Sequence, residues 1–402
     1  MELYIFNPDA DLALAHGGEN YIAPASARRM AADLAILPAW YACEGDAVLA
    51  PSAYNADFLQ RMHDVLGLDI KLATYPELSD YAAAVPVPWG WNLALRRQLV
   101  RGGFPLENLP SADTLHAYRR WASREQVAGC LSAFKDIPFC RGESWNLKDL
   151  SACRAFVECQ GHTLLKAPWS GSGKGLCWCA SGFTRSVSGW CARVLREQGC
   201  VVASPVYDKV ADFAMEFWKD EKKQAVFIGY SCFRTNERGG YWGNILLSNS
   251  RIEDDMGRYI PVEVLHRVRE TTEDVLTHRF PGYAGYLGVD MMVCRSEEGF
   301  WLHPCVEVNL RMNMGILAVN LYRRWLAPDT LGYFKIEYHA SPESLRARHH
   351  EDEVTFPMIL HEGRIVSGYL PLVPVTPYSC YRAFIKVVPD TGHFHSHTDL
   401  WP

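Results

Sequence analysis

The chain opens with short apolar runs that alternate with amphipathic stretches. Three runs, at residues 3–6, 47–50 and 70–73, have the length and composition of buried strands. Between them, residues 26–35 and 54–66 carry apolar side chains at three- and four-residue spacing, which predicts helices that pack one face on a sheet. Alternation of this kind is typical of βαβ units around a mostly parallel sheet. We therefore expect an α/β unit at the start of the chain.

Prolines and glycines mark the end of this first unit. A third helix is expected at residues 92–100, where two glycines follow it. The stretch 104–111 contains Pro105 and Pro110, which favour a linker over a regular element. We place a domain boundary here, so that residues 1–110 form an N-terminal α/β domain.

The rest of the chain mixes strands and helices in a different order. A polar helix over 112–134 precedes two strand-like runs, 162–167 and 176–180, which a glycine-rich segment joins as a β-hairpin. Further elements are expected as a helix at 184–198, strands at 201–207, 212–218 and 226–233, a helix at 262–278, an antiparallel pair at 286–294 and 300–310, and possible strands at 355–360 and 383–388. We divide this part into units of residues 111–200, 201–330 and 331–402, the last without an assigned role.

Composition narrows the class of protein. A chain of 402 residues with 49% hydrophobic and 12% aromatic residues can bury two or three cores and is not a disordered chain. A net charge of −6 does not favour a nucleic acid as partner. The start of the chain lacks the pattern of a signal peptide, and no run of about 20 apolar residues predicts a membrane span. The 13 cysteines, an odd number in largely apolar surroundings, are expected to be reduced thiols of a cytoplasmic protein without a membrane partner.

The glycine-rich segment between the two hairpin strands has two readings. It is either a flexible turn or a binding site for an anion, and glycine clusters are more often turns. A Walker A loop is excluded, because Lys174 is followed by Gly175 and a strand rather than by Ser or Thr and a helix. Lys166, on the strand before the tip, favours the anion reading, since an ammonium beside freed backbone N–H groups can bind phosphate oxygens.

Polar residues interrupt two neighbouring apolar strands near residue 300. Asp290 lies on the first, and Glu307, Asn309 and Arg311 follow on the second at a spacing of two, which places the three on one face. Two carboxylates and an amide oxygen are ligands that suit Mg²⁺ or Mn²⁺. The alternative is a structural network in which Arg311 simply pairs with Glu307.

In this order, the hairpin lysine, the glycine-rich tip and the Glu307-Val-Asn-Leu-Arg311 motif resemble the ATP-grasp superfamily over residues 111–325. The resemblance implies an α/β (α+β) fold in which two sheet-containing subdomains clamp ATP, preceded by an N-terminal mostly parallel α/β domain. It implies ATP and Mg²⁺ or Mn²⁺ as cofactors. Lys166 and Arg311 would act on the transferring phosphoryl group. The implied metal ligands are Asp290, Glu307 and Asn309, and the implied nucleotide contacts are Arg124, Lys166, Gly171, Ser172, Gly173, Lys174, Ser204, Val206, Tyr207 and Asp212.

Two positions depart from the superfamily pattern. Arg124 stands where many members have a further ATP-binding lysine, and arginine keeps the charge but not the geometry. Ser204, in the segment 203–207 that corresponds to the adenine-binding hinge, replaces an acidic residue. Asp212 matches the acidic position that holds the ribose hydroxyls. The serine affects the contact to the adenine amino group and not the backbone contacts of the hinge.

The resemblance implies a ligase that activates a carboxylate as an acyl phosphate for attack by an amine, a thiol or a similar nucleophile, with ADP and phosphate as products. Its partners would be a small-molecule or peptide carboxylate and the nucleophile. A small-molecule kinase on the same fold and a non-catalytic nucleotide-binding protein are the alternatives. The sequence names neither substrate nor the oligomeric state.

Three further groups carry weaker signals. The segment 7–11, with Asp9 and Asp11, follows the first strand of the parallel sheet and is either an Asx turn or a ligand contact. Arg234 and Arg238 could meet an anionic substrate. In the tail, three alternating histidines could present imidazoles to a metal, although a solvated tail is the simpler reading: His393, His395 and His397.

Overall fold

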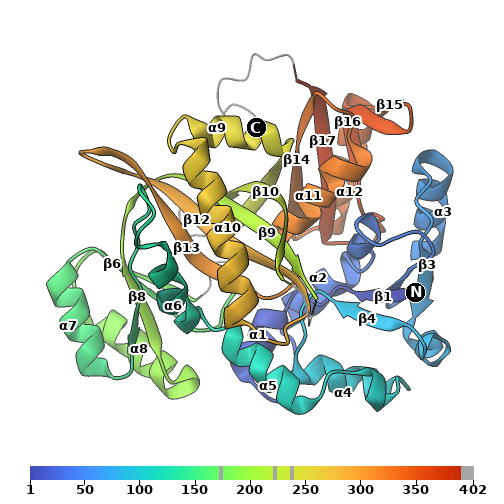
Figure 1. The fold of residues 1–402 in the computed structure, drawn as a ribbon. Coiled ribbons are helices and arrows are strands. Elements are labelled where there is room, and N and C mark those ends of the chain that lie inside the picture. Colours follow the sequence, from blue (N-terminus) through green and yellow to red (C-terminus); the bar gives the residue numbers. More distant parts are fainter. Residues whose placement is uncertain (172–174, 221–223, 236–239, 391–402) are drawn as a thin grey trace.

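The computed structural model describes residues 1–171, 175–220, 224–235 and 240–390, and the strands of these residues form three sheets. A four-stranded sheet comes from the first part of the chain, a second four-stranded sheet carries the glycine-rich hairpin, and a nine-stranded sheet contains the strands from Asp208 onward, including the C-terminal ones. Figure 1 shows the N-terminal part in blue, the hairpin sheet with α7 and α8 in green, and the large sheet running through the centre.

The N-terminal sheet is parallel throughout, in the order β3-β2-β1-β4, as the alternating pattern predicted. Its strands are β1 (Glu2–Ile5), β2 (Ala47–Ala50), β3 (Lys71–Thr74) and β4 (Val85–Pro88), and its helices are α1 (Ala10–His16), α2 (Ala25–Asp33), α3 (Asn55–Leu66) and α4 (Leu93–Arg101). The predictions of a strand at 47–50 and of the three helices are confirmed to within two residues. Strand β4 was not predicted because Pro86 and Pro88 fall within it, and an edge strand tolerates prolines that a central strand would not.

The hairpin sheet is antiparallel, in the order β5-β8-β6-β7. Its elements are β5 (Trp145–Leu147), β6 (Thr163–Lys166), β7 (Leu176–Cys179), β8 (Val201–Pro205), α7 (Leu150–Gln160) and α8 (Arg185–Gln198). The expectation of one helix over 112–134 is wrong. The segment divides into α5 (Ala112–Trp121), a 3-10 turn at Arg124–Gln126 and α6 (Val127–Leu131). The side chain of Ser123 accepts a hydrogen bond from the backbone N–H of Glu125, so it starts a new turn instead of continuing the first helix.

The large sheet has the order β13-β12-β9-β10-β11-β14-β17-β16-β15. Its strands are β9 (Asp208–Lys219), β10 (Val226–Thr235), β11 (Tyr241–Leu246), β12 (Gly285–Ser296), β13 (Gly299–Asn309), β14 (Thr330–Tyr338), β15 (Ile359–His361), β16 (Arg364–Pro371) and β17 (Tyr381–Pro389). The predicted antiparallel pairing of β12 with β13 is confirmed. The predicted strand at 355–360 is wrong for its first part, because α12 (Pro342–Thr355) ends at Thr355 and β15 begins only at Ile359.

Alternating side chains give the two faces of the large sheet different partners. On β9, Phe213, Met215 and Phe217 point into a core shared with α5, α6, α9 (Asn249–Gly257) and α10 (Val262–Arg279). Ala214 and Glu216, the intervening residues, point to the opposite face. That face packs partly against α11 (Met314–Trp325) and is otherwise open to a cleft.

The strands after residue 330 are continuous with the rest of the large sheet and also contact the N-terminal domain. Trp40, fully buried, donates a hydrogen bond from Nε1 to the Leu372 carbonyl at 2.6 Å. Trp325 Nε1 donates to the Trp40 carbonyl at 3.1 Å. These two bonds fix the N-terminal domain to α11 and to the segment that follows β16. The domain bounds drawn from the sequence stay predictions.

All thirteen cysteines fall within the described residues, and none is paired in a disulfide. None of the helices formed by the described residues is long and apolar enough to cross a membrane. The histidines of the tail, at positions 393, 395 and 397, lie outside the described residues.

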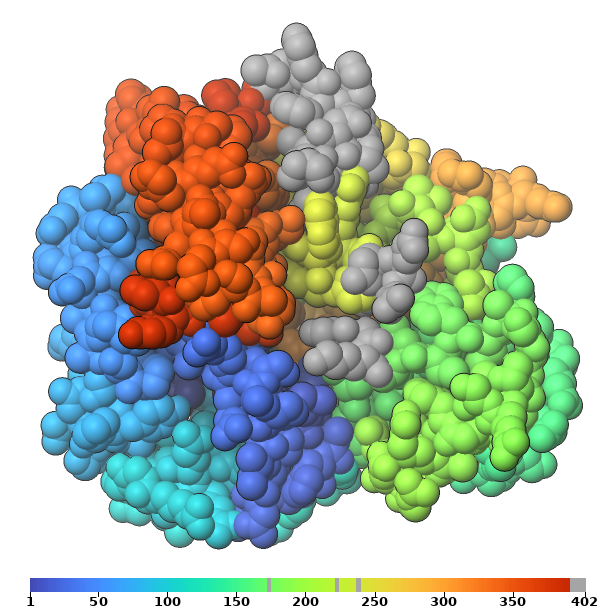
Figure 2. Space-filling view, turned by 180° about the vertical axis from the view of Figure 1, so that it is seen from behind, coloured from blue at the N-terminus to red at the C-terminus, as the bar shows by residue number. Residues whose placement is uncertain are grey.

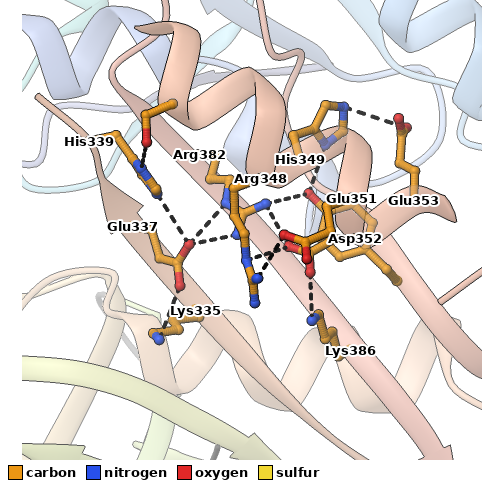
Figure 3. A network of polar contacts seen from close by, with 12 residues as sticks. Lys335, Glu337, His339, Arg348, His349, Glu351, Asp352, Glu353, Arg382 and Lys386 are labelled. Carbon is orange, nitrogen blue, oxygen red and sulfur yellow. Dashed lines mark hydrogen bonds and ion pairs between the residues drawn. The ribbon is translucent and has the colours of Figure 1, made fainter. Parts of the chain in front are cut away.

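A buried network of charges holds α12 on β14, β16 and β17 (Figure 3). Asp352, with 1% of its side chain exposed, forms ion pairs with Arg382 and Lys386 at 2.8 Å each. Arg382 also donates to Glu337 at 2.7 Å. Burial alone would raise the pKa of Glu337, but the hydrogen bonds and charge of Arg382 hold that pKa at about 2. The network therefore joins α12 to β14 and β17 through paired charges, and His349 on α12 is hydrogen-bonded to the Tyr369 hydroxyl on β16.

Replacing the central carboxylate of this network should destabilise the fold. Asp352→Asn leaves Lys386 without its buried counter-charge and Arg382 with Glu337 alone, and breaking such a pair typically costs about 3–5 kcal/mol. Urea unfolding measures the loss. Glu351→Gln, on the same helix but 61% exposed, is the matched control and should change stability by less than about 1 kcal/mol. A loss for Asp352→Asn no larger than that of the control would contradict this account.

Candidate active site

A cleft of about 480 Å³ lies where the three sheets approach one another. The N-terminal domain contributes residues from α1 and α2, the hairpin sheet contributes β6 and the start of the tip, and the large sheet provides the floor. Figure 2 shows the face of the molecule on which the blue, green and orange segments meet. Nine of the residues named from the sequence line this cleft: Arg124, Lys166, Gly171, Asp290, Glu307, Asn309, Arg311 and, from the segment first read as a turn or ligand contact, Asp9 and Asp11.

Lys166 is the last residue of β6 and pairs across the hairpin with Leu176, so the glycine-rich tip begins directly beyond it. The pKa of Lys166 is lowered to about 8. Burial is the largest cause and the nearby charge of Arg124 adds to it, while the carboxylates of Glu307 and Asp290 act in the opposite direction. Gly171 lines the cleft, and a Cβ there would meet the Asp11 carboxylate at 2.8 Å. Ser172, Gly173 and Lys174 lie outside the described residues.

Arg124 joins three segments of the site. Its Nη2 forms an ion pair with Glu307 at 2.8 Å and donates to the Ser170 carbonyl at 2.9 Å. Its Nη1 donates to the Ala167 carbonyl at 2.8 Å and to Ser170 Oγ at 2.6 Å. A lysine could not make this fork of contacts, because the planar guanidinium offers donors in several fixed directions. Arginine at this position therefore ties the base of the glycine-rich tip to β13.

The carboxylate pair is formed by strand register. Asp290 on β12 lies directly opposite Glu307 on β13, and Asn309 lies opposite Gly288. Burial, followed by the charges of Glu307 and Glu216, raises the pKa of Asp290 well above its usual range. Within the described residues, no group of three or more His, Cys, Asp or Glu is placed to hold a metal. Two carboxylates with an amide oxygen fit a divalent cation that takes its remaining ligands from phosphates or water.

Arg311 binds the N-terminal domain and not Glu307. Its Nε and Nη2 donate to the two oxygens of Asp11 at 2.8 Å each, and Nη2 also donates to Asn309 Oδ1 at 3.0 Å. The alternative in which Arg311 pairs with Glu307 is therefore wrong, since Glu307 pairs with Arg124. This bidentate contact closes the cleft on one side and places the N-terminal domain beside the carboxylate pair.

The residues predicted to bind the base and ribose are not among the described residues that line the cleft. Ser204 is buried on β8, and the Val206 N–H donates to the His162 carbonyl at 3.1 Å. Tyr207 packs edge-on against Trp301, with ring centroids 4.9 Å apart. Asp212 accepts a hydrogen bond from Thr235 at 3.2 Å, and Thr235 does line the cleft. The roles of these four positions stay predictions.

Glu216 was missed in the sequence. It lies on β9 at the floor of the cleft, 1% exposed, and accepts hydrogen bonds from Ser231 Oγ and Asn313 Nδ2 at 2.8 Å each. Burial raises the pKa of Glu216 to about 7, although the two hydrogen bonds and the charge of Arg311 lower it in part. A carboxylate inside the apolar run 213–217 is the signal that could have identified it, because such a group is rarely buried without a purpose.

Comparisons with known proteins support the fold. No family model matches the chain, and no curated protein matches it. A biotin carboxylase–beta-gamma-ATP complex from Campylobacter jejuni is similar over 96% of this chain and 87% of that chain, with a TM-score of 0.50 and 11% identity. An N5-carboxyaminoimidazole synthetase from Staphylococcus aureus complexed with ADP is similar over 87% and 94%, with a TM-score of 0.48 and 11% identity.

The class of protein follows from the arrangement of sheets and from the first of these likenesses. An N-terminal parallel sheet, a small antiparallel sheet with a glycine-rich hairpin and a large antiparallel sheet enclose one cleft. The chain therefore has the ATP-grasp fold, as the sequence motifs predicted. One solved structure that is similar over nearly the whole chain is the biotin carboxylase from Campylobacter jejuni.

Proposed function

We propose that this protein is an ATP- and Mg²⁺-dependent ligase that activates a carboxylate as an acyl phosphate and transfers the acyl group to a nucleophile. The observation that carries the proposal is the meeting, in one cleft, of two facing carboxylates with three basic side chains: Asp290 and Glu307 with Lys166, Arg124 and Arg311. Carboxylates for a divalent cation and cations for phosphate oxygens are the groups that phosphoryl transfer requires.

The charges of the cleft support a divalent cation. Five carboxylates line it against three basic side chains, so the described lining is anionic without a bound metal: Asp9, Asp11, Glu216, Asp290 and Glu307 against Arg124, Lys166 and Arg311. Asp290 and Glu307 would hold Mg²⁺ or Mn²⁺ together with Asn309. Bound to the nucleotide, the cation supplies Lewis-acid polarisation of phosphate oxygens.

The basic residues of the cleft have separate tasks in this proposal. Lys166 has no ion pair among the described residues and is therefore available for the α- and β-phosphates. Arg311, held in place by Asp11, faces the γ-phosphoryl group and offsets the charge that develops during transfer. Arg124 fixes Glu307 and the base of the tip. The shared fold with a biotin carboxylase–beta-gamma-ATP complex is consistent with nucleotide in this cleft.

The lining of the cleft also bears on the kind of intermediate. Within the described residues it contains no histidine and no cysteine, so the described lining offers no Ser-His or Cys-His pairing. Because the described lining offers no such activated nucleophile, the proposal places the activated acyl group on the substrate. An acyl phosphate meets this requirement, because the γ-phosphoryl group goes to the carboxylate oxygen and ADP leaves.

Product analysis tests the proposal. Carboxylic metabolites and small peptides are screened with MgATP and a mixture of amines and thiols, and ADP release is followed. A ligase releases free phosphate in step with ADP. A phosphorylated product that keeps the phosphate would identify a small-molecule kinase, and nucleotide binding without any ADP would identify a non-catalytic protein; either result rejects the proposal.

A further inference from the structure

The carboxylate of Glu216 is held in one orientation. Ser231 Oγ donates to Oε1 and Asn313 Nδ2 donates to Oε2, each at 2.8 Å. Two glycines make room for it, because a Cβ at Gly288 or at Gly315 would collide with a Glu216 oxygen and with one of its two hydrogen-bond donors. Backbone positions on two other elements, β12 and α11, therefore lack side chains where the carboxylate needs space.

The ion pairs of the described residues leave this carboxylate without a cationic partner. Among the described residues, no lysine, arginine or histidine nitrogen forms an ion pair with Glu216, whereas Glu307 pairs with Arg124 and Asp11 pairs with Arg311. A buried carboxylate that lacks a counter-charge costs folding free energy, which its two neutral donors offset only in part. It retains the capacity to accept a proton, and burial moves its pKa to about 7.

Strand register places Glu216 beside the carboxylate pair. Glu216 lies opposite Gly288, which in turn lies opposite Asn309. The next row of the same sheet face contains Ala214, Asp290 and Glu307. Glu216 is thus one row away from the groups assigned to metal and phosphate, on the side of the cleft that faces β10 and β11.

The part of the cleft beyond Glu216 has a different chemical character. Its floor is formed by β10, β11, β14 and β17, with Phe233, Tyr241, Asn244, Ile336 and Tyr381 in the lining. All three basic residues of the described lining are the ones assigned above to the nucleotide site, and none of them comes from β10, β11, β14 or β17. A second anion is therefore disfavoured there, whereas an amine with an apolar body meets aromatic and aliphatic side chains at one end and a carboxylate at the other.

We propose that Glu216 binds the amino group of the nucleophile and accepts the proton that this group loses when it attacks the acyl phosphate. The lone pair of the neutral amine forms the C–N bond, the C–O bond to the phosphoryl group breaks, and phosphate leaves with that electron pair. The N–H proton goes to a Glu216 oxygen and from there to the departing phosphate. The proposal rests on the proposed function and narrows its nucleophile to amines.

The ratio of the products formed from two different nucleophiles distinguishes a proton-accepting role of Glu216 from a purely structural one. Wild type and Glu216→Gln are compared with MgATP, the carboxylate found by the ADP screen, and either hydroxylamine or an amine from a panel of ammonium, methylamine and the amino acids. Hydroxylamine is uncharged and strongly nucleophilic at neutral pH, so its attack does not require a protein base. Rates of hydroxamate and amide formation are measured at saturating ATP.

Glu216→Gln is expected to lower amide formation about a hundredfold or more, the usual contribution of a general base, and to leave hydroxamate formation unchanged. Glu216→Asp, which restores a carboxylate, should recover part of the amide rate. Asp352→Asn, equally buried but in the network of Figure 3, should keep the wild-type ratio of the two products.

Two results would overturn the assignment of Glu216. A proportional fall of both products in Glu216→Gln would show that the residue supports the fold or the phosphoryl step, and an unchanged amide rate would show that it has no part in the transfer. If Glu216→Gln does not fold, the same ratio in Glu216→Asp decides, with a selective loss of amide expected. Wild type that releases ADP without any hydroxamate would reject the proposed function itself, and this inference with it.

Discussion

Asp290→Asn is expected to abolish the thermal stabilisation that Mg²⁺ and ATP give together, while raising the melting temperature of the protein without them. In the absence of a cation, burial and the charges of Glu307 and Glu216 disfavour the ionised form of Asp290. A neutral amide of the same shape removes this repulsion. The same change removes one of two anionic metal ligands, which should reduce ATP turnover about a hundredfold or more.

Thermal unfolding with and without MgATP measures both parts of this prediction. Asp352→Asn is the control, because it removes a buried carboxylate outside the cleft. The control should lower the melting temperature and keep the shift caused by MgATP. A full MgATP shift in Asp290→Asn would contradict the assignment of the metal to the carboxylate pair.

Lys166→Met should lose the largest share of nucleotide affinity among changes to the basic residues of the cleft. Methionine keeps the length and the apolar stem but not the charge, and loss of a preorganised cation at a phosphoryl group typically reduces turnover about 10²–10³-fold. Lys219→Met provides the control. Lys219 is also buried, at 2% exposure, but donates to the Phe280 carbonyl outside the cleft, so its loss should affect stability and not ATP affinity.

The same lysine predicts the pH dependence of ATP binding. Its pKa is lowered to about 8, so it is an ammonium below that pH and increasingly a neutral amine above it. Because the phosphates favour the ammonium, ATP affinity should fall as the pH rises through about 8. Calorimetry between pH 6.5 and 9.5 measures this step, and Lys166→Met should lack it. An affinity that is constant over this range in the wild type would place Lys166 away from the phosphates.

The sequence predicted those parts of the structure that depend on local pattern. Apolar spacing located three of the strands and three of the helices of the N-terminal domain, because one buried face leaves a regular signal. The spacing of two between Glu307, Asn309 and Arg311 predicted a shared face, and the register of β12 with β13 confirms that Asp290 lies opposite Glu307. The glycine-rich hairpin was predictable for the same reason, since its strands are adjacent in the chain.

Contacts between distant segments could not be predicted in this way. Asp11 and Arg311 are 300 positions apart, and no pattern near Asp11 identifies its partner. The hydrogen bonds of Glu216 and the space for its carboxylate depend on Ser231, Asn313 and two glycines from separate elements. The site around Glu216 can therefore be recognised only when β9, β10, β12 and α11 are assembled. The strands after residue 330 lacked an assignment because their pairing with β11 and with one another is also non-local.

The central claim is that the activated group is an acyl phosphate on the substrate, and trapping with hydroxylamine tests it most directly. Wild-type protein is incubated with MgATP and each carboxylate that triggers ADP release, with hydroxylamine present during turnover. Because a closed site shields an acyl phosphate from water, addition after turnover should trap little. The account predicts hydroxamate and ADP in equal amounts. ADP with a stable phosphorylated product and no hydroxamate, or AMP with pyrophosphate, would contradict it.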